Sequence, residues 1–120
     1  QSVSECPNVY VKLGGMAMPW SGFGWAERER PPSSDEFVAT YGAYYRHAIE
    51  TFSPARCMFE SNFPVDRLSL PYTTLWNAFE KLAAPYSPSE QDDLFRGTTV
   101  LSSWQPLSDE LHSHFNFALI

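Results

Sequence analysis

The sequence predicts an α/β fold in which parallel strands alternate with helices. Two short apolar segments, about 9–13 and 56–61, are bounded by glycine, proline and polar residues and are too short to be helices. Two longer segments, about 34–52 and 72–82, carry apolar residues at helical spacing. The order strand, helix, strand, helix is typical of a parallel α/β unit, because parallel strands need a long crossover connection.

The first predicted strand has two different faces. Val9, Val11 and Leu13 alternate with Tyr10 and Lys12, which is the period of two of a strand. A pair of glycines ends it. The loop that follows, 16–32, is rich in glycine, proline and large aromatic residues, and a loop of this length is uncommon unless it covers something.

Capping signals mark the starts of the helices. Ser33 with Glu36, and Ser87 with Glu90, predict capping boxes in which each serine binds the backbone three residues on. The first helix is expected to present an apolar stripe made of Phe37, Val38, Tyr41, Tyr44, Tyr45, Ala48, Ile49 and Phe52. The second is expected to present Tyr72, Leu75, Trp76, Phe79 and Leu82, and a short helix follows Ser87. A weak amphipathic helix is expected over about 108–117.

Two segments of the chain resemble one enzyme family. Segment 57–66, CMFESNFPVD, resembles the last barrel strand of the amidohydrolase superfamily, specifically its amidohydrolase-related branch, where the strand reads Met-Phe-Gly-Ser-Asp-Tyr/Trp-Pro. Segment 6–15, CPNVYVKLGG, is similar to that family's preceding strand, Pro-Asn-Val-Tyr-x-Lys-Leu-Ser/Gly-Gly. Their order and spacing also fit. The resemblance covers residues 1–98 and implies part of a TIM-barrel hydrolase domain, whereas residues 99–120 form a divergent tail.

The resemblance implies a partial TIM (β/α)8 barrel, made of the last two parallel βα units plus a terminal helix. A complete barrel needs about 200 to 250 residues, so a chain of 120 residues is not expected to close one. The family's metal-binding His-x-His would lie upstream of Gln1. His112 and His114 imitate that motif but have no strand pattern around them. We therefore expect the chain to be the C-terminal third of an enzyme.

Asn62 is the candidate catalytic residue, because it stands where the family has an aspartate that ligates a metal or activates water. A carboxamide cannot take a proton near neutral pH. Two roles therefore remain open: Asn62 orients water or substrate while an upstream group transfers the proton, or it only caps the turn before Pro64. No metal ligand is assigned in this chain. The resemblance leaves open a divalent metal such as zinc in the full-length enzyme.

Lys12, Glu60 and Trp25 are the candidate substrate-binding residues. Glu60 shares a strand face with Asn62, and Lys12 on the neighbouring strand is its obvious counter-ion, so a structural ion pair and a functional role are both open. Trp25 lies in the loop after the first strand, on the face where barrel enzymes bind substrate. It is expected either to wall a pocket or simply to pack. Asp66 is expected past the strand end, in a turn.

The composition indicates a globular chain and disfavours nucleic acid and membrane as partners. Hydrophobic residues make up 43% and aromatic residues 16%, which argues against disorder. The net charge of -6 disfavours nucleic acid and anionic membranes. No apolar run approaches the roughly 18 residues of a membrane span. Cys6 and Cys57 lie in apolar strand patterns, so we expect free thiols and a reducing, cytoplasmic location.

The resemblance implies hydrolysis of a C–O or C–N bond in a small organic molecule, such as a lactone, ester or amide, by activated water. This chain alone is expected to be inactive. The alternative is a non-catalytic, truncated or degenerate product that acts at most as a small αβ binding or association domain. The expected partners are a small-molecule substrate and either the missing N-terminal half of the barrel or a second copy of the chain.

Overall fold

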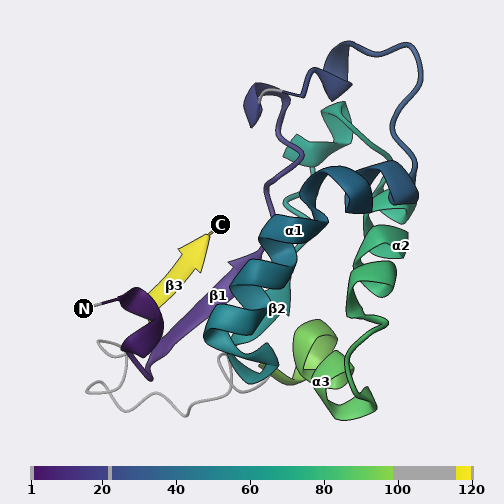
Figure 1. Ribbon diagram of the computed structural model, residues 1–120. Coiled ribbons are helices and arrows are strands. Elements are labelled where there is room, and N and C mark those ends of the chain that lie inside the picture. Colours follow the sequence, from purple (N-terminus) through teal and green to yellow (C-terminus); the bar gives the residue numbers. More distant parts are fainter. Residues whose placement is uncertain (1, 22, 99–115, 120) are drawn as a thin grey trace.

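A computed structural model describes residues 2–21, 23–98 and 116–119 (Figure 1). The described residues form a mixed α/β unit with a three-stranded sheet in the order β2-β1-β3. The order strand, helix, strand, helix, short helix agrees with the prediction. The bounds are Val9–Leu13 for β1, Ser34–Phe52 for α1, Cys57–Phe59 for β2, Tyr72–Ala83 for α2, Pro88–Asp92 for α3 and Asn116–Leu119 for β3.

β1 and β2 pair in parallel, as predicted, and α1 makes the connection between them. Val11 lies opposite Cys57 and Leu13 opposite Phe59. The N–H of Glu60 donates to the Leu13 carbonyl at 3.0 Å, so the pairing continues one residue past β2. The side chains of β1 alternate between buried and half-buried, which is the two-faced pattern expected from the sequence.

β3 differs from the helix expected near the end of the chain. Most of that expected helix, with His112 and His114, lies outside the described residues, but residues 116 and 117 belong to a strand. β3 pairs in parallel with β1, with Val9 opposite Asn116 and Lys12 opposite Leu119. The backbone groups at the outer edge of β1 need hydrogen-bond partners, and an extended segment supplies them where a helix does not.

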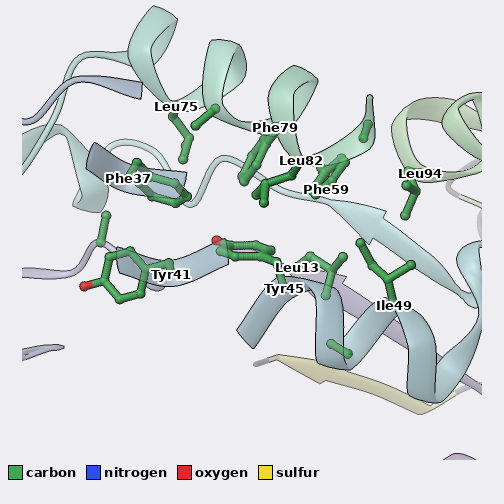
Figure 2. Close-up of a cluster of buried hydrophobic side chains, with 14 of the residues drawn as sticks. Leu13, Phe37, Tyr41, Tyr45, Ile49, Phe59, Leu75, Phe79, Leu82 and Leu94 are labelled. Carbon is green, nitrogen blue, oxygen red and sulfur yellow. The ribbon is translucent and has the colours of Figure 1, made fainter. Parts of the chain in front are cut away.

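The core lies between the sheet, α1 and α2 (Figure 2). Phe59 of β2 stacks on Phe79 of α2 with their ring centroids 4.5 Å apart. Phe79 also meets Phe37 and Tyr45 of α1 edge-on, at 6.2 Å and 5.7 Å. Each such ring pair contributes about 0.5–1.5 kcal/mol beyond the buried area. Phe79 therefore links the sheet to both long helices.

Tyr44 and Tyr72 do not belong to the core, although the sequence placed both in apolar stripes. Tyr44 is 57% exposed and Tyr72 is 50% exposed. On α1 the core face is set by the i, i+4 series Phe37, Tyr41 and Tyr45. Tyr44 lies about 100° around the helix from Tyr45, which turns it toward solvent.

The predicted caps begin α1 and α3, with one difference. Ser33 Oγ accepts from the N–H of Glu36 at 3.1 Å, but the Glu36 carboxylate pairs with Arg28 Nη1 instead of reaching back. At α3 the capping box is complete, because the N–H of Ser87 also donates to Glu90 Oε2 at 2.9 Å. In the described ranges no helix is long and apolar enough to cross a membrane.

β1 ends where its backbone comes closest to β2. A Cβ atom added at Gly14 would lie 2.6 Å from the Glu60 carbonyl oxygen, closer than real Cβ atoms come. The next residue, Gly15, has a φ of +78°, which favours glycine. The pair of glycines that ended the strand pattern is therefore required by this contact and by this turn.

We expect Phe79→Ala to lower the free energy of unfolding by about 3–5 kcal/mol, because it leaves a cavity among four aromatic rings. Urea unfolding followed by circular dichroism measures this. Tyr44→Ala is the matched control and should change the free energy of unfolding by less than about 0.5 kcal/mol, since that ring is 57% exposed. Similar losses in the two variants would contradict the core assigned here.

We expect Gly14→Ala to destabilise the fold more than Gly24→Ala. Gly24 has a φ of +62° with no atom within 4 Å of an added Cβ, so its substitution costs only the left-handed strain, about 1 kcal/mol. At Gly14 the added atom meets the β2 backbone, which has to move. The same urea measurement compares them, and equal losses would show that the two strands separate at the end of β1 without cost.

Candidate active site

The candidate site lies at the carboxyl ends of β1 and β2. Polar residues at this end of parallel strands are where α/β enzymes place their reactive groups. Asn62 follows β2, and its amide lies against the end of β1: a Cβ atom built at Gly15 would be 3.6 Å from Asn62 Nδ2 and 3.8 Å from its Cγ. The two strand ends thus meet at Asn62.

The backbone of Asn62 begins a turn. Its φ is +50°, a left-handed conformation that asparagine adopts more readily than most residues. Its carbonyl accepts from the N–H groups of Val65 at 3.0 Å and Asp66 at 3.3 Å, which starts the 3-10 turn Val65–Leu68. The turn role foreseen for Asn62 is therefore present. It uses the main chain and leaves the side-chain amide for other contacts.

The sequence predicts the turn that contains Asp66 but not the burial of this residue or its contact with Asn62. Asp66 lies in the expected turn, but it is only 1% exposed, and its Oδ1 accepts from Asn62 Nδ2 at 2.9 Å. Burial raises the pKa of the Asp66 carboxyl, the hydrogen bond from Asn62 lowers it, and the charge of Glu60 raises it. The turn brings the two side chains together, because the Asp66 N–H donates to the Asn62 carbonyl, and no periodic pattern in the sequence signals this contact.

Two tyrosines of α1, Tyr41 and Tyr45, are close enough to Asp66 to sense its charge. Burial raises the pKa of both Tyr41 and Tyr45, and the Asp66 charge raises each further. The Tyr41 hydroxyl shares a hydrogen bond of 3.1 Å with Ser21 Oγ from the loop after β1. Asp66 is therefore buried beside the end of β2, within reach of the charge-sensitive tyrosines of α1.

Lys12 and Glu60 form the ion pair predicted from the strand period. Lys12 Nζ contacts Glu60 Oε2, and the two side chains are 38% and 21% exposed, so the pair is half-buried rather than buried. Lys12 lies opposite Met58, which places Glu60 diagonally across on the same sheet face. Substrate binding by these two residues stays a prediction.

Trp25 is packed into the core, with only 4% of its surface exposed. Its ring meets Tyr41 at 5.1 Å and Phe37 at 5.9 Å, and the Arg28 guanidinium lies 5.9 Å from its centroid. The hollow beside it has no room even for a water molecule, whereas ligand pockets measure roughly 300 Å³ or more. These contacts support the packing alternative. Substrate binding by Trp25 stays a prediction.

Metal-ligating and nucleophilic side chains are sparse in the part of the chain that is described. Among those residues no group of three or more His, Cys, Asp and Glu is placed to hold a metal ion. His47 lies exposed on α1. Cys6 and Cys57 are free thiols, as expected, and burial raises the pKa of Cys57 to about 12. Cys57 is therefore a core residue and not a nucleophile at neutral pH.

Comparisons with known proteins agree with the resemblance seen in the sequence. The family model described as Amidohydrolase matches residues 2–100. The uncharacterized protein y4mH of Sinorhizobium fredii (strain NBRC 101917 / NGR234) is 34% identical over 95 residues, which are 79% of this chain and 28% of that protein. The crystal structure of an amidohydrolase from Burkholderia multivorans with bound zinc has a TM-score of 0.72 and 25% identity, covering 87% of this chain.

The chain spans only 28% of the length of the Sinorhizobium protein and 34% of the Burkholderia chain. The matched residues nevertheless include β1, α1, β2, α2 and α3, and with them the strand ends that meet at Asn62. Because the family model covers most of its length, this chain belongs to the amidohydrolase family.

Proposed function

We propose that this chain contributes the last two βα units of a TIM-barrel hydrolase, which uses activated water to cleave a C–O or C–N bond in a small molecule. Membership of the amidohydrolase family supports hydrolysis as the reaction class. The parallel β1–β2 pair with its connecting helix supports the barrel, because a barrel repeats this unit. The low coverage of longer similar proteins supports a need for further strands. Lactones, esters and amides are the proposed substrates.

The observation that carries the proposal is the position of Asn62 at the carboxyl end of β2, beside the end of β1. Its Nδ2 donates to Asp66, so the amide oxygen is the atom left to accept from water or from a substrate O–H or N–H. Asn62 thus orients the attacking water or the substrate. Because an amide does not take a proton near neutral pH, another carboxylate or a histidine accepts the proton.

Lys12 and Glu60 are proposed to bind the polar part of the substrate. Their ion pair lies on one face of the sheet near the site and remains partly exposed, so a charged or hydroxylated group can reach it. Trp25 is proposed to support the wall of the pocket from beneath, through its contact with Tyr41. A small-molecule partner agrees with the net charge of -6, which disfavours polyanions.

A metal ion is not assigned a step in this proposal. The similar structure from Burkholderia multivorans contains zinc. In this chain an amide, a weak metal ligand, stands where the family has a carboxylate. The described residues also provide no group of three metal-ligating side chains. These residues do not fit a metal site by themselves, so no proposed step passes through a metal ion.

We expect Asn62→Ala to lower kcat by about 10²-fold or more, because loss of a preorganised hydrogen-bonding group at a reacting centre has this effect. The assay uses a chimera in which residues 2–98 replace the corresponding third of the Burkholderia multivorans amidohydrolase, with a panel of lactones, esters and amides. Asn77→Ala, at an exposed position of α2, is the control and should keep the chimera's rate. Unchanged turnover in Asn62→Ala would reduce Asn62 to a turn residue.

A second function is favoured by β3, which gives the sheet an edge strand from the end of the same chain. In this alternative the chain is a non-catalytic αβ domain, and β3 covers the edge of β1 through which a second copy would otherwise pair. We expect truncation after residue 115 to cause concentration-dependent self-association, because it uncovers the outer edge of β1. Analytical ultracentrifugation measures the mass of both forms. A monomeric truncated chain at high concentration would exclude association through this edge.

A further inference from the structure

The site holds its carboxylate one turn away from the position at which the family carries one. Residue 62 is an amide, and the carboxylate is that of Asp66, whose Oδ1 lies 2.9 Å from Asn62 Nδ2. Asp66 is 1% exposed, so solvent does not screen it. A buried carboxylate without hydrogen-bond donors is unstable, and Asn62 supplies a donor that an aspartate at position 62 would not.

We propose that Asp66 is the positioning residue of this strand end: it fixes the Asn62 amide with its oxygen as the outward acceptor and requires residue 62 to be neutral. Two carboxylates at hydrogen-bonding distance cannot both be ionised. The carboxylate at 66 thus explains the amide at 62. The inference rests on the proposed function for its chemical meaning, although the pairing itself is a property of the fold.

The groups around Asp66 make a second negative charge unfavourable. From the end of β2, Glu60 already raises its pKa. From α1, Tyr41 and Tyr45 face it, and neither brings a positive charge. Among the ion pairs of the described residues none includes Asp66, and Lys12 is engaged with Glu60. An aspartate introduced at 62 would therefore meet no cation that offsets the repulsion.

This arrangement restricts what the site can bind at residue 62. One N–H of Nδ2 donates to Asp66, and Nδ2 also lies against the end of β1 at Gly15, so the amide oxygen is the atom offered to a ligand. The matching group is a hydrogen donor, such as the attacking water, an alcohol or an amide N–H of the substrate. A substrate carboxylate or phosphate would face an oxygen and is disfavoured there. Asp66 thus selects a neutral or donor group of the substrate for this position without touching it.

The test compares the complete chain with Asn62→Asp, Asp66→Asn and the double variant. Urea unfolding at pH 5 and pH 8 gives the unfolding equilibrium constant of each. Asn62→Asp should lose stability as pH rises, because the proton shared by the two carboxyl groups of the folded variant has a pKa above that of the unfolded chain. At pH 8 the folding chain has to take up a proton or bring two negative charges together. We expect the unfolding equilibrium constant of Asn62→Asp at pH 8 to exceed that of the parent at least tenfold. Asp66→Asn, which keeps an acceptor for Asn62, should avoid this loss.

The double variant Asn62→Asp with Asp66→Asn reverses the hydrogen bond and should return the unfolding constant at pH 8 to within about threefold of the parent. Asn77→Asp, at an exposed position, adds the same charge and should show no such pH dependence. Equal losses for Asn62→Asp at both pH values, or no rescue by the second substitution, would overturn the pairing. Because no activity is measured, these outcomes are independent of whether the chimera hydrolyses any substrate.

The orientation of the amide has its own readout. Hydrogen exchange of the Asn62 side-chain NH2, followed by NMR, should be slower in the parent than that of Asn77, and Asp66→Ala should abolish the difference. Asp66→Asn should keep it, because an amide oxygen also accepts. If the Asn62 NH2 exchanges as fast as that of Asn77 in the parent, Asp66 does not hold it and the positioning role is overturned.

Discussion

The parallel pairing of β1 with β2 determines where every candidate residue of the site lies. Its register brings Gly14 against the Glu60 carbonyl, too close for any side chain. The same register puts Lys12 and Glu60 on one face, where they pair. It also directs Phe59 into the core, onto Phe79. A slip of one residue would move Phe59 to the other face of the sheet. Aromatic packing therefore fixes the register, and the register fixes the site.

Regular patterns made much of the fold predictable from sequence. The alternation in β1 and the serine that caps α1 are local signals with direct physical causes, and both appear where expected. The core face of α1 was harder, because its apolar stripe is wide enough to admit Tyr44 beside Tyr45. β3 could not be predicted, since its extended form depends on the edge of a strand far away in the sequence. A short segment that becomes a strand by pairing with a distant strand does not need an alternating pattern of apolar and polar residues.

The same distinction between local and non-local signals holds for the residues of the candidate site. Asn62 could be located because it directly follows an apolar strand and stands in a recognisable motif. The burial of Asp66 depends on a left-handed residue at position 62 and on packing near the tyrosines of α1. Neither is encoded in a periodicity. Trp25 shows the converse: an aromatic residue in a loop looked equally suited to a pocket and to packing, and contacts with Tyr41 and Phe37 bury it.

A neutral amide held by a buried carboxylate does different chemistry from a carboxylate alone. A carboxylate at the strand end can both orient water and remove its proton. Asn62 can only orient, because the negative charge lies on Asp66, which is buried and already engaged with the amide. In the proposed mechanism, orientation and proton transfer are therefore divided between different residues. The proposed hydrolase therefore needs its proton acceptor on another strand, and the role proposed for Asn62 is to set the direction from which the water attacks.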